Sequence, residues 1–515
     1  MTLSPIPSTS VPTHVPTHVK DWHAAARDLS PEAEAFIDGR YRPALSGATF
    51  ATLNPATGRI LADVAACGEA DADAAVAAAA RAFNKGAWSR AAPAARKAVL
   101  LHLADLIEAD ADAFALLETL DMGKPIRDSL TIDVPAAVRC LRWFAEAADK
   151  LYDEIAPTRG DVLAMIRRVP VGVVAAIVPW NFPLVTAMTK IAPALAAGNS
   201  VVLKPSELSP LSALRLGRLA AEAGLPDGVF NVLPGIGAEA GRALALHDGV
   251  ASLAFTGSTA VGKLLMTYAG RSNMKKVGLE CGGKSANIVL ADCPDLDRAV
   301  QAAAMGVFQN QGQICNAGTR LILERPIRDE FLEKLVALVR TFEPGDPLLP
   351  ETRFGALVSA AHADRVRGYI ASGLADGATR LTGDGPPAPG LAPETCVRPT
   401  VFADVDNSMA IAREEIFGPV LSVIDAGSLD EAVAIANDSP YGLAAAVWTG
   451  SLARALEAER RLDTGFVWIN TLRVGDITVP FGGVKASGSG RDKSFHAFDS
   501  VTHRKSVWVD LSAGS

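Results

Sequence analysis

"SVVLKPSELSPLSALRLGRLAAEAGLPDGVFNVLPG", residues 200–235, contains the pattern that decides the fold. Its first part, "SVVLKPS", is an apolar, partly β-branched run that predicts a strand. "SPLSALRLGRLAAEAGLP" predicts a helix, with Ser209 as its N-cap and Pro210 in its first turn. "GVFNVLPG" then predicts a second strand. A strand, a helix and a strand in this order form a βαβ unit, whose two strands run parallel.

The alternation continues on both sides of this unit. Before it, "IRRVPVGVVAAIVP" predicts one buried strand, and "LVTAMTKIAPALAAG" predicts a helix that ends at Gly198. After it come "VASLAFTGS" as a strand and "TAVGKLLMTYAG" as a helix. Beyond Ala291 the pattern restarts with "DLDRAVQAAAMGVFQNQ", "RLILE" and "RDEFLEKLVALVRTF". We therefore expect an α/β protein with a mostly parallel sheet, right-handed crossovers and a second α/β domain.

Composition and charge exclude several classes of protein. A chain of 515 residues is too long for one hydrophobic core, which predicts two or three domains. The net charge of -8 argues against a nucleic-acid partner. No stretch reaches the roughly 18 unbroken apolar residues of a membrane span, and no secretory signal is visible. The six cysteines lack disulfide or metal-site spacing. We expect a cytoplasmic protein without a metal.

Two strand ends suggest a dinucleotide site. "LAFTGSTAVG" predicts a strand, a tight turn and a helix start, where Gly257 admits a pyrophosphate and Ser258 can donate to it. Gly257 and Gly262 form a Gly-x4-Gly spacing, which a plain βα turn would also explain. In "VVLKPSELSP", Glu207 could accept from both ribose hydroxyls with Lys204 assisting, although a solvated turn would look the same.

Four further motifs contain candidate catalytic groups. Cys315 lies among Gly, Gln and Asn in "FQNQGQICNAGTR", whereas a packing cysteine normally has apolar neighbours. Glu280 ends an apolar strand in "LECGGKS", and Asn181 lies between two prolines in "PWNFP". "EEIFGPV" places Glu415 beside Phe417. Each motif alone is also compatible with a structural role.

Together with "PFGGVKASGSGRD", these motifs resemble the aldehyde dehydrogenase superfamily over residues 36–511 and in the family's order. The resemblance implies a Rossmann-like NAD-binding domain, a second α/β catalytic domain and a small β oligomerisation arm. It implies NAD as cofactor, with NADP possible but disfavoured by the charge of Glu207. It also suggests a homotetramer built as a dimer of dimers.

The domain boundaries follow from the patterns and the resemblance. We predict a flexible N-terminal arm at residues 1–30, where Pro and Thr are frequent. Residues 31–150 and 171–281 are expected to form the NAD-binding domain, and 282–490 the catalytic domain. Residues 151–170 and 491–515, which contain alternating edge-strand patterns, are expected to form the oligomerisation arm and the C-terminal tail.

The resemblance also implies a mechanism. Cys315 attacks the aldehyde, and the Asn181 amide and the Cys315 N–H bind the oxyanion of the thiohemiacetal. Hydride passes to the nicotinamide, and Glu280, whose burial should raise its pKa, activates the water that hydrolyses the thioester. Lys190 and Asp492 map to a proton path, with Asp492 where the family often has glutamate. The implied cofactor contacts are Val178, Trp180, Lys204, Glu207, Gly257, Ser258, Gly262, Glu415 and Phe417.

Further sequence resemblances narrow the choice of substrate. "RKAVLLHLADLIEADADAFALLETLDMGKPIRDSL" and "GRDKSFHAF" resemble putrescine-pathway enzymes that oxidise gamma-glutamyl-gamma-aminobutyraldehyde. In the aldehyde tunnel, Arg473 would attract a carboxylate, unless it merely points to solvent. Alternatives are a related omega-amino or guanidino aldehyde, a broad-specificity aminoaldehyde or succinate semialdehyde activity, and a thiol esterase. The implied tunnel residues are Thr186, Thr189, Ile314, Asn316, Arg473, Gly475 and Phe481.

Overall fold

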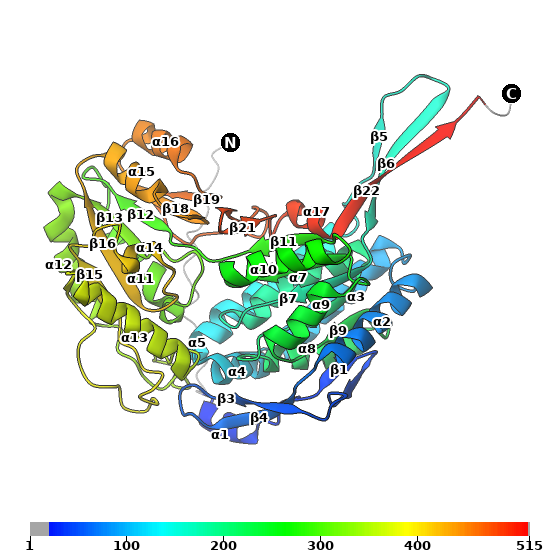
Figure 1. Ribbon diagram of the computed structural model, residues 1–515, viewed down its shortest axis with the longest axis horizontal. Helices are drawn as coiled ribbons and strands as arrows, with labels where there is room; N and C mark the ends of the chain where they lie inside the picture. Colours follow the sequence, from blue (N-terminus) through cyan, green and yellow to red (C-terminus); the bar gives the residue numbers. More distant parts are fainter. Residues whose placement is uncertain (1–19, 513–515) are drawn as a thin grey trace, which may run out of the picture.

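The structure is a computed structural model that describes residues 20–512, arranged as two lobes and a projecting arm (Figure 1). Residues 1–19 of the predicted flexible arm lie outside the described residues. The rest of that segment contains helix α1 (Trp22–Asp28), whose N-cap Asp21 accepts from Ala24 N and whose Trp22 is buried.

The first lobe contains an eight-stranded sheet in the order β2-β1-β9-β8-β7-β10-β11-β21. Strands β9, β8, β7, β10 and β11 are parallel, whereas the edge pairs that involve β1 and β21 are antiparallel. The chain therefore winds outward from β7 in both directions, as predicted. The strands are β1 (Ala35–Ile37), β2 (Arg40–Arg42), β7 (Val173–Ile177), β8 (Ser200–Lys204), β9 (Phe230–Val232), β10 (Ser252–Thr256), β11 (Lys276–Glu280) and β21 (Gly488–Ser489).

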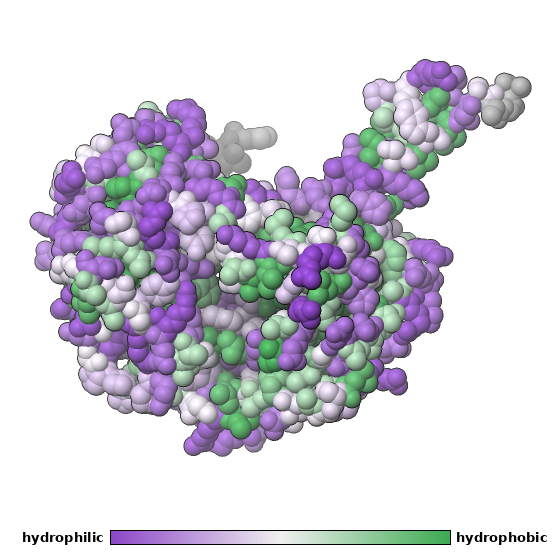
Figure 2. Space-filling model, in the orientation of Figure 1, coloured by the Kyte–Doolittle hydropathy of each residue, from purple (hydrophilic) through white to green (hydrophobic). Residues whose placement is uncertain are grey.

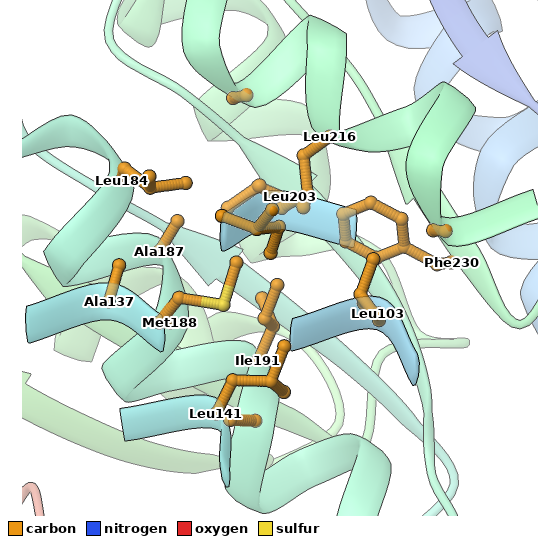
Figure 3. Packing of buried hydrophobic residues seen from close by; sticks show 14 of the residues in the cluster. Leu103, Ala137, Leu141, Leu184, Ala187, Met188, Ile191, Leu203, Leu216 and Phe230 are labelled. Carbon is orange, nitrogen blue, oxygen red and sulfur yellow. The ribbon is translucent and has the colours of Figure 1, made fainter. Parts of the chain in front are cut away.

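Helices cover both faces of this sheet. One face is covered by α3 (Pro93–Ala109), α6 (Val134–Ala147), α7 (Pro183–Ala197) and α8 (Leu211–Glu222), and the other by α2 (Glu69–Lys85), α9 (Arg242–Leu246) and α10 (Thr259–Arg271). Figure 3 shows Met188 and Ile191 of α7 packed against Leu203 of β8. Each of these fully buried side chains contributes about 1.5–3 kcal/mol relative to exposure.

Two local predictions in this lobe are wrong. The strand expected over "IRRVPVGVVAAIVP" is two strands, β6 (Val162–Pro170) and β7, because Gly172 at φ +127 breaks the extended run. Helix α8 begins at Leu211, and Ser209 does not cap it. The Leu211 N–H donates instead to Oδ2 of Asp121, 2.9 Å away on α4 (Ala111–Met122).

The second lobe contains a seven-stranded sheet in the order β14-β15-β16-β13-β12-β18-β19, parallel except for β14. It confirms the predicted second α/β unit. Its strands are β12 (Ala286–Val289), β13 (Arg320–Glu324), β14 (Thr379–Arg380), β15 (Thr400–Ala403), β16 (Val420–Ala426), β18 (Ala444–Trp448) and β19 (Phe466–Ile469). Its helices include α11 (Leu296–Phe308), α12 (Arg328–Val339), α13 (Ala360–Ala375), α14 (Ala410–Arg413), α15 (Leu429–Asn437) and α16 (Leu452–Arg461).

The arm is a three-stranded antiparallel sheet of β5 (Glu154–Ala156), β6 and β22 (Thr502–Asp510). The two segments with edge-strand patterns therefore pair with each other, from Thr502 opposite Pro170 to Asp510 opposite Val162. The arm projects from the first lobe and carries apolar side chains (Figures 1 and 2). Among the described residues, no helix is long and apolar enough to cross a bilayer.

Candidate active site

The predicted cofactor residues follow the carboxyl ends of neighbouring parallel strands. Val178 follows β7, and its N–H donates to the carbonyl of Lys204, the last residue of β8, at 3.1 Å. Gly257 and Ser258 follow β10, which lies on the other side of β7. This edge faces the second lobe, and Figure 2 shows the molecule hollowed between the lobes. Ligands bind at this point in doubly wound sheets.

The Lys204–Glu207 pair fits a nucleotide ribose. Nζ of the buried Lys204 lies 3.0 Å from Oε2 of Glu207. Burial opposes ionisation of Glu207, but Lys204 and the amides of Glu207 and Gly237 outweigh it and lower its pKa. A Cβ on Gly237 would lie 3.9 Å from both the lysine and the carboxylate. The glycine therefore leaves this charged pair open to a ligand on that side.

The turn after β10 fits a phosphate. Ser258 is the N-cap of α10 and accepts from Val261 N at 3.3 Å, so the N-terminal amides of the helix begin at the strand edge. Gly262 faces the sheet instead. A Cβ there would lie 2.6 Å from Sγ of Cys281, so this glycine allows α10 to pack closely on β11.

Asn181 is held by buried polar groups that the sequence patterns did not reveal. Its Nδ2 donates to the carbonyl of Gln313 at 2.8 Å. Its own carbonyl accepts from Nζ of Lys124 at 2.9 Å and from Nδ2 of Asn310 at 3.1 Å. Lys124 is fully buried and also binds Asp133. In the sequence, Lys124 looks like an ordinary loop lysine after "DMG", and only its burial reveals the contact.

The backbone before Cys315 is left-handed at three successive residues. Asn310, Gln311 and Gly312 have φ values of +52, +56 and +74. Helix α11 therefore ends at Phe308, so the final "QNQ" (residues 309–311) of the predicted helix lies outside it. A Cβ on Gly312 would lie 2.2 Å from the carbonyl oxygen of Gly418, so only glycine allows this contact. Such strained backbone is common at functional sites.

Cys315 is partly exposed as a residue, but its thiol is buried among protein atoms. Burial, together with the nearby carboxyls of Glu415 and Glu280, raises the pKa of its thiol to about 12, and the Asn316 amide and Arg473 oppose this shift. The resting group is therefore a thiol at neutral pH. It needs a base to become the nucleophilic thiolate.

Glu280 is the last residue of β11 and is 5% exposed. Its Oε2 has no hydrogen-bond partner within residues 20–512. Burial and the charge of Asp492 raise its pKa well above the ordinary value, against Lys190 and Arg491. A cavity of about 10 Å³ beside it can hold one water. A carboxylate with a raised pKa and a neighbouring water site suits the role of general base.

The predicted proton path is connected to this carboxyl. Nζ of Lys190 lies 2.7 and 2.8 Å from the two carboxylate oxygens of Asp492, so the shorter acid still forms the ion pair. Both residues line the small cavity beside Glu280.

Glu415 and Phe417 come from the second lobe. Oε1 of Glu415 accepts from Gly283 N at 3.1 Å, and burial raises its pKa to about 7. Phe417 has φ +60, and its ring meets the ring of Trp180 edge to face at 5.2 Å between centroids. The two lobes thus bring "PWNFP", "LECGGKS", "FQNQGQIC" and "EEIFGPV" together.

The residues predicted to line the aldehyde tunnel differ in their contacts and in their positions relative to Cys315. The hydroxyls of Thr186 and Thr189 donate to backbone carbonyls within or next to their own helix, at 2.6 and 2.9 Å. Ile314 and Asn316 flank Cys315 in the chain. Phe481 lies beneath the ammonium of Lys493, 5.5 Å from the ring centroid.

Arg473 is partly buried and does not simply point to solvent. Its Nη1 donates to Oε1 of Gln309 at 2.8 Å, and its φ is +62. Burial lowers its pKa, and Cys315, Asp128 and Asp133 oppose that shift through their charges. A cation therefore lies near the Cys315 thiol, with two carboxyls nearby.

Comparison with known proteins agrees with this geometry. The model of the aldehyde dehydrogenase family matches residues 41–507. The "NADP/NAD-dependent aldehyde dehydrogenase PuuC" of Escherichia coli is 54% identical over 496 residues, which is 96% of this chain and 99% of that protein. Indole-3-acetaldehyde dehydrogenase AldA of P. syringae, solved in complex with NAD+, has a TM-score of 0.94 and 55% identity, covering 95% of this chain and 99% of that chain.

Gamma-glutamyl-gamma-aminobutyraldehyde dehydrogenase of Burkholderia cenocepacia has a TM-score of 0.93 and 55% identity, with the same coverage. These similarities extend over almost the whole of each chain, and they confirm the predicted family, fold class and cofactor. The chain belongs to the aldehyde dehydrogenase family and is an NAD-dependent aldehyde dehydrogenase.

Proposed function

We propose that Cys315 is the nucleophile, Asn181 an oxyanion donor and Glu280 the general base of aldehyde oxidation. The observation that carries this proposal is the packing of the Cys315 turn against Asn181, whose Nδ2 contacts the carbonyl of Gln313. The second hydrogen of that amide remains for the oxyanion formed when sulphur adds to the carbonyl. The base first takes the thiol proton, because the raised pKa of Cys315 leaves little thiolate.

NAD, when bound, accepts the hydride from the thiohemiacetal. Lys204 and Glu207 would hold the adenosine ribose, Gly257 and Ser258 the pyrophosphate, and Glu415 and Phe417 the nicotinamide end. Val178 and Trp180 would complete this side of the site. Gly262 would contribute by packing rather than by contact.

In the second half-reaction, Glu280 deprotonates the water that attacks the thioester and yields the free acid. The cavity beside Glu280 offers room for one water, and the unpartnered Oε2 is a free acceptor. Lys190 and Asp492 would then pass the proton away from the carboxyl. A thiol esterase would use the same cysteine but would leave the nucleotide-binding edge without a purpose.

We propose a gamma-glutamylated aminoaldehyde of polyamine catabolism as the substrate. A relative of 55% identity carries the name of the gamma-glutamyl-gamma-aminobutyraldehyde enzyme. The gamma-glutamyl head bears one carboxylate and one ammonium. Arg473 and Asp128 offer these opposite charges, and the charge of each affects the pKa of the other. A bare aminoaldehyde carries only an ammonium, so it could pair with Asp128 but not with Arg473.

The test compares kcat/KM for gamma-glutamyl-gamma-aminobutyraldehyde with that for 4-aminobutyraldehyde, with NAD. We expect a ratio far above one, and we expect Arg473→Gln to lower it by about tenfold or more, the value of one charged hydrogen bond. A ratio near or below one would indicate a general amino- or guanidinoaldehyde dehydrogenase instead.

For the assembly we propose a cytoplasmic homotetramer, built as a dimer of dimers. The arm supports this proposal, because its sheet has open edges and its large apolar side chains are exposed. Ile155 and Trp508 on the sheet are 73% and 69% exposed, and Tyr152 just before β5 is 76% exposed. Large exposed apolar groups of this kind commonly mark an interface.

A further inference from the structure

Helix α13 contacts the loop 414–417 through three side chains. His362, Arg365 and Tyr369 lie three and seven residues apart along the helix, so they share one face. The loop contains Glu415 and Phe417, to which the proposed function assigns the nicotinamide end.

Two of these side chains bind three consecutive backbone carbonyls. The His362 Nε2 hydrogen-bonds with the carbonyl of Phe417 at 2.7 Å. The Arg365 guanidinium donates to the carbonyls of Ile416 and Glu415 at 2.8 and 2.7 Å. Because a carbonyl can only accept, Nε2 of His362 must carry the hydrogen. Burial lowers the pKa of His362 to about 4, so the ring stays neutral at working pH.

Tyr369 extends the contact to the first loop residue. Its hydroxyl donates to Oε2 of Glu414 at 2.5 Å, and the Arg365 guanidinium lies over its ring, 5.1 Å from the centroid. All four loop residues are therefore held from one helix face.

The loop needs such support because Phe417 is strained. A non-glycine residue at φ +60 costs about 1–2 kcal/mol and persists only where its surroundings enforce it. The His362 ring also packs edge to face on Trp180, 5.2 Å away, and Trp180 in turn packs on Phe417.

The segment that leads into the same helix also contacts the Cys315 turn. Val358, just before the N-cap of α13, donates its N–H to Oε1 of Gln313 at 3.0 Å. On the other side of the loop, Gly418 abuts Gly312 in the Cys315 turn. Helix α13 and the residues that lead into it therefore contact both the proposed cofactor loop and the turn that carries Cys315.

We propose that His362, Arg365 and Tyr369 form a clamp of positioning residues that sets the distance between the nicotinamide-binding loop and Cys315. This inference rests on the proposed roles of Glu415 and Phe417. Hydride transfer depends steeply on such placement, since displacement by about 1 Å can cost a hundredfold in rate.

Arg365→Met tests the clamp, with Arg367→Met as the matched control. Arg367 makes the same kind of contact outside the site, donating to the carbonyls of Pro393, Glu394 and Cys396. We expect Arg365→Met to slow NADH formation in the first turnover by about tenfold and to weaken NAD binding, measured by fluorescence titration. Arg367→Met should change neither quantity.

A second pair of variants separates positioning from folding. His362→Gln keeps a donor for the Phe417 carbonyl and should stay near the wild-type burst rate, whereas His362→Leu should lose it. Equal rates in Arg365→Met and Arg367→Met, or in the two His362 variants, would overturn the clamp. A normal burst in both Arg365→Met and Phe417→Leu would contradict the clamp and the proposed role of the loop together. A slow burst in Phe417→Leu with a normal burst in Arg365→Met would contradict only the clamp.

Discussion

At the scale of single residues, burial shifts the pKa values of Cys315 and Glu280 in the same direction. Burial raises the pKa values of both groups, so the free enzyme keeps a thiol beside a carboxyl that has unusually high basicity for its type. The thiol proton of Cys315 can therefore leave only when another group takes it up at the same time. Because both groups lose their protons more readily at higher pH, we expect kcat/KM, measured by NADH absorbance, to increase as the pH rises.

Glu280→Gln should separate the two half-reactions. The amide can neither take the thiol proton nor activate water, so the NADH burst should be slower than in the wild type and the thioester should accumulate after it. Steady-state turnover should fall by about 10²–10⁴-fold. Stopped-flow absorbance of NADH with a reactive aldehyde measures both phases. Cys315→Ala serves as the control and should bind NAD without any burst; full turnover in Glu280→Gln would remove Glu280 from the role of base.

Residue types and their order were sufficient to select the candidate chemical groups, but not their supports. "PWNFP" and "FQNQGQIC" pointed to Asn181 and Cys315 through their joint resemblance to aldehyde dehydrogenase motifs, since each motif alone also allowed a structural role. The carbonyl contact from Lys124 arises only when the turn after α4 folds over the "PWNFP" loop. Contacts between segments more than fifty residues apart leave no local pattern in one sequence.

At the scale of elements, α4 supplies buried carboxyls to the N-terminal ends of two other helices. Oε1 of Glu118 accepts from Leu184 N at 3.0 Å at the start of α7, and Oδ2 of Asp121 accepts from Leu211 N at the start of α8. Both contacts satisfy amides that have no partner within their own helix. The sequence placed the cap on the nearer Ser209, because a carboxylate ninety residues away could not be anticipated.

The raised pKa of Asp121 makes stability depend on pH. Burial raises it to about 8, far above the ordinary value, so between about pH 4 and pH 8 the folded state binds a proton that the unfolded state lacks. Stability should therefore fall as the pH rises across this window, by at most about 1.4 kcal/mol per pH unit for this group.

Asp121→Asn carries no titrating proton there and should flatten the curve of unfolding free energy against pH. Urea titrations at several pH values measure it. The exposed Asp384→Asn is the control and should keep the wild-type slope; an unaltered slope in Asp121→Asn would mean that this carboxyl is ionised in the folded protein.

At the scale of the whole molecule, periodicity predicted two α/β units and two edge-strand segments, one internal and one near the C-terminus. Hydrophobic alternation is repeated over many residues, so it survives local errors such as the split at Gly172. The return of β21 to the first sheet, where Gly488 pairs with Glu280, was not predictable, because its two-residue strand has no periodicity.

The arm gives a prediction about assembly. Trp508→Glu places a charge on the exposed face of β22 and should convert the proposed tetramer to a smaller species, because burying an unpaired charge at an interface is costly. Sedimentation velocity measures the change. Leu452→Glu on α16, at 73% exposure, is the control; a monomeric wild-type chain or an intact Trp508→Glu tetramer would contradict the proposed use of the arm.

The raised pKa of Cys315 also determines how the enzyme withstands oxidants. Peroxide and alkylating reagents attack the thiolate, and the protonated thiol reacts slowly. Burial raises the pKa values of Cys67, Cys140 and Cys281 to about 12 as well. The idle enzyme therefore stores these thiols in their resistant form. During turnover the Cys315 sulphur is bonded to the substrate carbon as thiohemiacetal and thioester, which also keeps it from reacting with oxidants.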